Sequence, residues 1–199
     1  MHSVTDSAIG RLGRRLSTTL QISRCARRLA ADRGLDGFTM EELAAEAGVS
    51  RRTVFNYFPG KVDAVLGPMP EPTDEALELF RSGGPHGDLV LDLRQLVSSI
   101  LDSQDVEREE LTRWRRLLST HEKLLAATHD RFMRLSEWLV SEIETREGPS
   151  FDRRRARVAI GLLGSLFDAS LDAFLADRRR RPLTAHFDES LRVARELLG

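Results

Sequence analysis

Apolar and small side chains recur at helical spacing along most of the 199-residue chain, and the alternation typical of strands is almost absent. The first clear case is residues 17–33, in which positions i, i+3, i+4, i+7 and i+8 form one apolar stripe. These positions hold Ile22, Cys25, Ala26, Leu29 and Ala30. Gly34 then suits the C-terminal cap of an amphipathic helix. In this stripe Cys25 is interpreted as a small hydrophobic residue, with a reactive thiol as the alternative.

The next segment, "GFTMEELAAEAGVS", contains start and stop signals for a second helix. Thr39, followed three residues later by Glu42, is a capping box, in which each side chain satisfies a backbone N–H of the first turn. Gly48 can take the positive φ that a sharp turn requires, and Ser50 is a new N-cap. A short third helix over residues 51–57 follows, so the pattern predicts a helix-turn-helix.

The rest of the chain indicates a helical body. Prolines 68, 70 and 72 break the helix that begins at Lys61, and "SGGPHG", residues 82–87, is a loop. We predict further helices over residues 61–66, 73–80, 88–102, 106–118, 122–146, 151–177 and 183–198. The predicted fold class is all-α, with a flexible basic arm (1–16), a three-helix helix-turn-helix domain (17–66) and a larger helical domain (67–199).

Composition and charge narrow the classes of protein. The net charge is only −1, yet residues 1–66 carry ten basic and seven acidic side chains, which favours nucleic acid as the partner of the N-terminal region. A single cysteine excludes an intramolecular disulfide framework and fits a reducing cytoplasm. The longest apolar run, residues 158–167, is too short to span a bilayer, and no signal peptide is expected. We therefore expect a cytoplasmic protein with no membrane partner.

The third helix carries the candidate chemistry. If Val54 and Phe58 face inward, then Arg51, Arg52 and Phe55 share the outward side. Asn56 and Tyr57 then lie on its flanks, and Lys61 follows the Pro59–Gly60 break. Arginine can bind guanine edges, asparagine can bind adenine or a phosphate, and phenylalanine can contact thymine methyls. The alternative is that the arginines only solvate the helix and that Phe55 belongs to the core.

The stretch "FTMEELAAEAGVSRRTVFNYFPGKVDAVL" resembles the DNA-binding domain of TetR/AcrR-family transcriptional regulators. The match covers roughly residues 17–66, and two positions depart from the family pattern. Position 55 is phenylalanine where the family has tyrosine, and Thr18-Thr19 replaces an early arginine, for which Arg14 and Arg15 are possible substitutes. The resemblance implies that Arg51, Arg52, Thr53 and Phe55 lie near bases and that Thr39, Ser50, Asn56, Tyr57 and Lys61 lie near phosphates.

The resemblance also implies an effector cavity in the body. The layout is similar to the subgroup of mycofactocin-type regulators, which suggests a hydrophobic, acyl-CoA-like effector, with Arg113, Arg115, Arg116 or His121 as partners for an anionic head. The alternative is that the apolar members are ordinary core. The implied pocket residues are Trp114, Arg115, His121, Phe132, Met133, Trp138 and Phe167.

The helix predicted over residues 151–177 is apolar around most of its circumference, and several small residues let another helix approach closely. In the family that it resembles, the last two helices of each subunit form a four-helix dimer bundle, so we expect a homodimer. A buried helix within one subunit is the alternative. The candidate interface residues are Gly161, Gly164, Ser165, Asp168, Leu171, Leu191 and Leu198.

No catalytic or metal-binding pattern is legible. The five histidines are scattered, no zinc-binding spacing occurs, and the glycine-rich loop lacks the lysine and hydroxyl residue of a phosphate loop. We therefore expect no enzyme activity, no metal and no cofactor. The sequence predicts a homodimeric repressor that a small molecule releases from double-stranded, palindromic operator DNA. There are two alternatives: an architectural or constitutive DNA-binding regulator without an effector, and an enzyme with an accessory helix-turn-helix.

Overall fold

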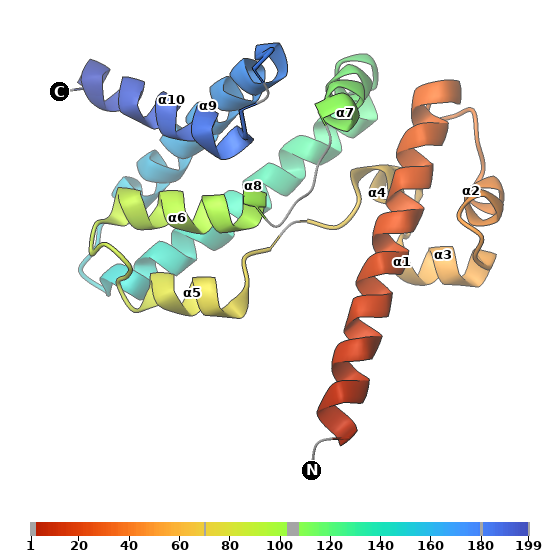
Figure 1. Cartoon of the computed structure of the whole chain (residues 1–199), viewed down its shortest axis with the longest axis horizontal. Coiled ribbons are helices and arrows are strands. Elements are labelled where there is room, and N and C mark those ends of the chain that lie inside the picture. The colour runs from red at the N-terminus through yellow and green to blue at the C-terminus, as the bar shows by residue number, and fades with distance from the viewer. Residues whose placement is uncertain (1–2, 70, 103–107, 180, 199) are drawn as a thin grey trace. The chain divides into compact units, whose positions relative to one another are not determined.

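The computed structural model describes residues 3–69, 71–102, 108–179 and 181–198, and regular structure in this part of the chain is entirely helical (Figure 1). The all-α prediction is therefore confirmed. The helices are α1 (Ser3–Arg33), α2 (Met40–Glu46), α3 (Arg51–Tyr57), α4 (Lys61–Leu66), α5 (Asp74–Arg81), α6 (Leu89–Asp102), α7 (Arg108–Thr120), α8 (Glu122–Glu147), α9 (Arg153–Ala176) and α10 (Leu183–Leu198).

Most predicted helices agree with the structure to within two residues at each end, and α1 is the exception. It begins at Ser3, although the sequence was expected to form a loosely ordered arm over residues 1–16. Residues 3–16 contain no proline, and their glycines weaken a helix without forbidding it. The basic arm is thus a helical extension of α1.

The chain divides into two compact units, which are described separately. Unit 1 comprises Met1–Met69 and Arg113–His129, and unit 2 comprises Pro70–Thr112 and Asp130–Gly199. The sequence placed the boundary between the helix-turn-helix domain and the larger helical domain between residues 66 and 67. It missed that the chain returns to unit 1 later in the sequence. Leu117 of α7 and Leu124 of α8, which are 5% and 0% exposed, belong to the core of that unit.

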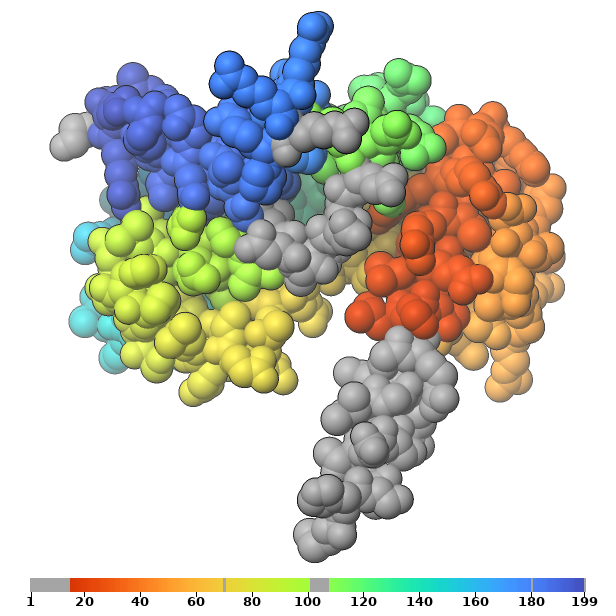
Figure 2. Space-filling model, viewed as in Figure 1, coloured from red at the N-terminus to blue at the C-terminus, as the bar shows by residue number. Residues whose placement is uncertain are grey.

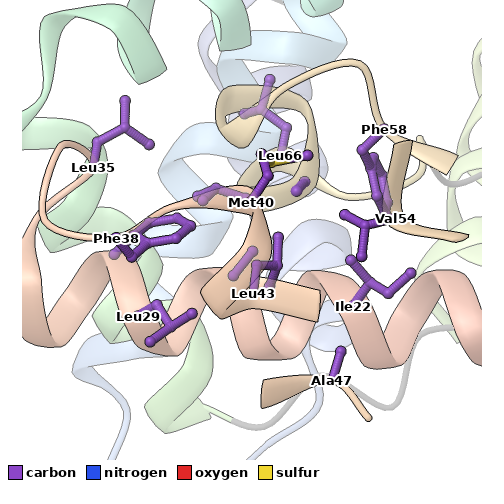
Figure 3. Packing of buried hydrophobic residues seen from close by; sticks show 14 of the residues in the cluster. Ile22, Leu29, Leu35, Phe38, Met40, Leu43, Ala47, Val54, Phe58 and Leu66 are labelled. Atoms are coloured by element: carbon purple, nitrogen blue, oxygen red, sulfur yellow. The ribbon is translucent and has the colours of Figure 1, made fainter. Parts of the chain in front are cut away.

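Unit 1 packs α2, α3 and α4 onto α1 around one apolar core. Ile22 and Leu29 of α1, Leu43 of α2, Val54 of α3 and Leu66 of α4 converge there (Figure 3). Arg27 of α1 also fixes the C-terminal end of α4, since its guanidinium donates to the carbonyl oxygens of Val65 and Leu66 at 3.0 and 3.1 Å. These orphan carbonyls at a helix end thereby gain a partner.

Unit 2 has its own core, to which α5, α6, α8, α9 and α10 contribute. Helices α9 and α10 pack against each other, and α6 contacts both α5 and α10. Figure 2 shows α5 and α6 (yellow to green) and α9 and α10 (blue) forming adjoining parts of the surface of this unit. Phe80, Leu93, Ile143 and Phe187 are essentially inaccessible.

Two carboxylates are buried in unit 2, and each has an arginine partner. Asp92 accepts from Arg146 Nη2 at 2.6 Å and from the His86 backbone N–H at 2.8 Å. Glu142 accepts a two-point contact from Arg81, at 2.6 and 2.9 Å. Because a buried charge without a partner is costly, these pairs fix how α5, α6 and α8 meet.

Candidate nucleic-acid interface and ligand cavity

The start of α2 is fixed by the predicted capping box. The Thr39 hydroxyl accepts from the Glu42 N–H at 3.1 Å, and the Glu42 carboxylate accepts from the Thr39 N–H at 2.7 Å. The bond from the Thr39 N–H, followed by that from its hydroxyl, holds the pKa of Glu42 below its usual value. Since folding lowers this pKa, the stabilisation is complete above the unfolded value of 4.5 and is lost as the pH falls through the folded pKa.

The turn into α3 also follows the predicted chemistry. Gly48 has a φ of +64°, in the region that other residues rarely adopt. Ser50 caps α3 by accepting from the Thr53 N–H at 3.0 Å, and the two hydroxyls lie 2.8 Å apart. Thr39, Ser50 and Thr53 therefore have defined structural roles in shaping the two helices.

The inward side of α3 is fixed by Val54 and Phe58, which are 0% and 4% exposed (Figure 3). Phe55, between them in sequence, is 43% exposed. The two interpretations of Phe55 are thereby separated, because its ring lies on the surface and not in the core. Arg51, Arg52 and Asn56 are also exposed, so α3 presents two cations, an amide and an aromatic ring to solvent.

Arg51 has two neighbours on this surface. Its Nε lies 2.7 Å from Glu41 Oε1, and its guanidinium stands over the Phe55 ring at 5.3 Å. Both partners of the ion pair are more than half exposed, so the pair contributes little to stability and separates easily. Glu41 is a neighbour of this surface that the sequence reasoning missed, although its place as an acidic residue in the first turn of α2 was a usable signal.

Tyr57 and Lys61 are less available than the sequence suggested. Tyr57 packs partly against the core of unit 1, and the Arg15 guanidinium stands over its ring at 5.8 Å. Lys61 is half-buried, and its ammonium donates to the Phe38 carbonyl oxygen at 2.8 Å and lies over the Phe38 ring. A phosphate contact from Lys61 would have to use its other N–H groups, so this role stays a prediction.

A cavity of about 270 Å³ lies inside unit 2, between α6, α8 and α9. Its described lining is apolar except for the hydroxyl of Ser136. Helix α6 contributes Leu93, Leu96, Val97 and Ile100; α8 contributes Phe132, Leu135, Ser136 and Leu139; α9 contributes Ile160, Leu163, Gly164 and Phe167.

Of the seven predicted pocket residues, only Phe132 and Phe167 line this cavity. Trp114, Arg115 and His121 belong to unit 1, where the Trp114 ring stacks on Arg27 and His121 Nε2 faces the Leu35 N–H at 3.4 Å. The alternative of ordinary packing is correct for Trp138, which packs against the core of unit 2, while Met133 is 47% exposed. The prediction selected mainly aromatic residues, whereas the described lining of this cavity is mainly leucine, isoleucine and valine.

The predicted dimer residues also separate into two groups. Gly161, Ser165, Asp168 and Leu198 are exposed, and Leu171 is half-buried. Gly164 and Leu191 pack within their own unit, because Gly164 faces the Phe132 ring and Leu191 is only 8% exposed. The outer surfaces of α9 and α10 instead expose Val158, Leu162, Val193 and Leu197.

Among the described residues, α9 is the one helix that is long and apolar enough to span a membrane by length and composition. The sequence reasoning missed this because Asp168 and Asp172 interrupt the apolar run. A single such helix is weak evidence for a span, since a packing helix of a soluble protein passes the same test, and a carboxylate within a bilayer is costly.

Among the described residues, no group of three His, Cys, Asp or Glu side chains could hold a metal ion.

Comparisons with known proteins agree with the geometry of unit 1. Residues 22–65 match the family model "Bacterial regulatory proteins, tetR family". A search of curated proteins gave no match.

The solved structures similar to the chain include the following two. One is a protein from Mesorhizobium loti MAFF303099 described as a tetR-family transcriptional regulator, with 22% identity, 90% and 96% of the two chains covered, and a TM-score of 0.49. The other is Thermus thermophilus FadR, described as a TetR-family transcriptional repressor in complex with lauroyl-CoA, with 24% identity, 88% and 92% coverage, and a TM-score of 0.46. At TM-scores below 0.5, neither likeness bears on the function of this chain. With the family match to residues 22–65 and the capped helices α2 and α3, the N-terminal part of this chain is a DNA-binding helix-turn-helix domain of the tetR family of bacterial regulatory proteins.

Proposed function

We propose that this chain is a transcriptional regulator that reads operator DNA with α3. The observation that carries the proposal is the two-sided character of that helix, whose Val54 and Phe58 are buried while Arg51, Arg52 and Phe55 face solvent. A helix seated in this way can enter a major groove without disturbing its own packing. The described cavity lining offers no His, Asp or Glu, so the enzyme alternative gains no support.

The exposed side chains divide by role. Arg51 and Arg52 bind base edges, with Thr53 beside them, and Phe55 packs against thymine methyls. Thr39, Ser50, Asn56, Tyr57 and Lys61 lie on the side of the phosphates and set the position of the helix. Arg51 exchanges Glu41 for a guanine edge when DNA binds, which is cheap because the ion pair is exposed.

The regulator acts as a homodimer in the cytoplasm. A palindromic operator requires two recognition helices, roughly 34 to 36 Å apart, related by two-fold symmetry. The exposed apolar side chains on the outer surfaces of α9 and α10, namely Val158, Leu162, Val193 and Leu197, support a second copy as their cover. A self-complementary interface of this kind is the usual basis of a two-fold dimer.

The cavity of unit 2 is the proposed effector site. The cavity has room for a small hydrophobic molecule, since its volume is about 270 Å³ and its described lining is almost wholly apolar. This room supports an effector and disfavours the alternative of a regulator without one. The chain is then a repressor, released when the effector favours a conformation that does not fit DNA, and a ten-fold loss of operator affinity needs about 1.4 kcal/mol of coupling.

The cavity supports only one part of an acyl-CoA-like effector, namely its acyl chain. The apolar lining suits an acyl chain, whereas Arg115 and His121, two of the residues proposed to hold an anionic head, belong to unit 1 and do not line the cavity. A thermal-shift series with acyl-CoAs, free fatty acids and neutral hydrophobic compounds tests this point, and stabilisation by none of them would remove the effector from the proposal.

The DNA-reading role is tested by selecting operators from a random DNA pool and measuring gel shifts with variants. Arg51→Ala and Arg52→Ala should each weaken the selected sequence by about 1–3 kcal/mol and relax the preference at one or two base pairs. Lys61→Ala should weaken all sequences alike and reduce the salt slope by about one. Arg178→Ala, an exposed arginine in unit 2, is the control and should match the wild type. If Arg51→Ala and Arg52→Ala also matched it, α3 would not be the recognition helix.

A further inference from the structure

The described lining of the unit 2 cavity differs from that of most ligand sites in having almost no polar anchor. None of its described lining residues carries a charge, and the Ser136 hydroxyl is their one polar side-chain group. Burying an ionised group in such surroundings is strongly unfavourable, because no partner replaces its water. The lining therefore selects against a carboxylate or an ammonium inside the cavity.

The volume sets the size of the occupant. An apolar cavity of about 150 Å³ stays dry and holds a benzene ring, and this cavity measures about 270 Å³. Scaling between the two gives room for on the order of ten carbon atoms. A molecule of this size fills the cavity, which is partly open to solvent.

One aromatic side chain lies at the rim. Phe132 of α8 lines the cavity, yet it is 45% exposed, so one part of its ring faces the interior and another faces solvent. The ring rests on α9 at Gly164, where an added Cβ would lie 2.7 Å from the Phe132 Cζ. Only glycine at position 164 lets the ring lie this close to the helix, so Gly164 is the seat of Phe132.

We propose that the cavity binds an uncharged, mainly hydrocarbon molecule of about ten carbons, and that Phe132 closes the cavity over it by resting on Gly164. This inference rests on the proposed effector site and narrows its ligand. It differs from an acyl-CoA-like effector in that the ligand is neutral as a whole and is enclosed. Entry and exit require the Phe132 ring to leave Gly164.

Ligand class is tested by displacement of the neutral ten-carbon fluorescent probe 1-aminonaphthalene from the full-length protein at pH 8. The competitors are decan-1-ol, decanoate and decanoyl-CoA, which share one chain length, each used below its micelle-forming concentration. Decan-1-ol should bind at least ten-fold more tightly than either anion. Equal or tighter binding of decanoate or decanoyl-CoA, or no binding of the probe to the wild type, would overturn the proposal.

Location is tested with two valines of α6. Val97 lines the cavity, while Val90 is 38% exposed and is not among the lining residues. Val97→Phe should fill the space and weaken decan-1-ol at least ten-fold, and Val90→Phe should leave binding unchanged. Equal binding by both folded variants would place the ligand elsewhere.

The closing role of Phe132 is tested by stopped-flow kinetics, which also keeps the proposal testable if Val97→Phe does not fold. Gly164→Ala moves the end of a flexible side chain and should be tolerated. Gly164→Ala and Phe132→Ala should each raise the probe's association and dissociation rates several-fold, with a smaller change in Kd. Unchanged rates in both variants would refute the closure.

A separate readout distinguishes this inference from the proposed function. Decan-1-ol is titrated into the complex with a selected operator fragment, and release should follow the same concentration dependence as probe displacement. If decan-1-ol displaces the probe but leaves the DNA complex intact, the ligand class holds and the effector role fails. If Arg51→Ala and Arg52→Ala leave DNA binding unchanged, the DNA-reading role fails and the ligand result is unaffected.

Discussion

The two units use their interiors in different ways. In unit 1, Ile22, Leu43, Val54 and Val65 are completely buried, and α1 to α4 close around them. In unit 2, a comparable set of apolar residues leaves about 270 Å³ unfilled between α6, α8 and α9. A filled core resists deformation, whereas a cavity gives a ligand something to stabilise. The difference indicates that the filled core of unit 1 keeps its surface in a fixed shape, whereas a ligand bound in the cavity of unit 2 can stabilise that unit.

The same contrast applies to charge. Ion pairs such as Arg51–Glu41 and Arg33–Glu42 in unit 1 lie on the surface. Unit 2 buries the Asp92–Arg146 pair, whose side chains are 0% and 4% exposed. Exposed pairs contribute little and exchange easily, while a buried pair fixes geometry and is costly to break. The exposed Arg51–Glu41 pair is therefore easily exchanged, whereas the buried Asp92–Arg146 pair orients α6 and α8 of unit 2.

The comparison can be measured unit by unit, because each unit contains one of the two tryptophans. Trp114 belongs to unit 1 and Trp138 to unit 2. Trp138→Phe leaves a fluorescence reporter of unit 1, and Trp114→Phe leaves a reporter of unit 2. The variants below are made in both backgrounds.

The largest effect is expected from Arg146→Met. It leaves the Asp92 carboxylate buried without its cationic partner and should lower the free energy of unfolding by about 3–5 kcal/mol. Urea unfolding followed by Trp138 fluorescence measures it. Arg192→Met, which breaks exposed ion pairs with Glu189 and Glu196, is the control and should cost far less than Arg146→Met. Similar costs for the two variants would contradict a distinct role for buried charge.

The next largest effect compares two leucines. Leu43→Ala removes a fully buried side chain from the filled core of unit 1 and should cost about 4 kcal/mol. Leu163→Ala enlarges an existing cavity, where the side chain already has fewer neighbours, and should cost about 2 kcal/mol. Urea midpoints read from the tryptophan of each unit test this order. The reverse order would mean that the space in unit 2 is closed in solution.

A smaller effect is expected from the capping box. Thr39→Ala removes the acceptor of the Glu42 N–H and should destabilise unit 1 by about 1 kcal/mol. The change should appear in the Trp114 signal and be absent from the Trp138 signal. Thr39→Ser retains the acceptor and should recover most of the loss, and failure to do so would show that the methyl group matters more than the hydrogen bond.

The smallest effect concerns Glu41. Glu41→Gln releases Arg51 from its carboxylate partner and removes one negative charge near the proposed DNA surface. Operator affinity in gel shifts at 0.1 M salt should rise by about two- to five-fold, because the exposed pair is weak. Glu109→Gln, a carboxylate of unit 2, is the control. Weaker binding by Glu41→Gln would show that the pair positions Arg51 for DNA.

Much of unit 1 could be predicted from the sequence, because its signals are local. A capping box, a positive-φ glycine and a new N-cap each act within four residues, and the structure confirms all three at Thr39, Gly48 and Ser50. The spacing of Val54 and Phe58 also predicted the buried side of α3 correctly. In unit 2 the helices were predicted, but the predicted pocket shares only Phe132 and Phe167 with the observed cavity. The cavity joins residues from α6, α8 and α9 that lie up to 74 positions apart, from Leu93 to Phe167.

By itself, the sequence determined the all-α class, nearly every helix boundary and the buried side of α3, because helix caps, proline breaks and 3.6-residue periodicity are properties of neighbouring residues. Tertiary structure decided where Phe55 lies, that α7 and α8 contribute Leu117 and Leu124 to the core of unit 1, and which residues surround the cavity. The physical reason is that a helix stripe specifies which side is buried but not what lies opposite. That partner, and the space left between the two, depends on side chains from the whole unit.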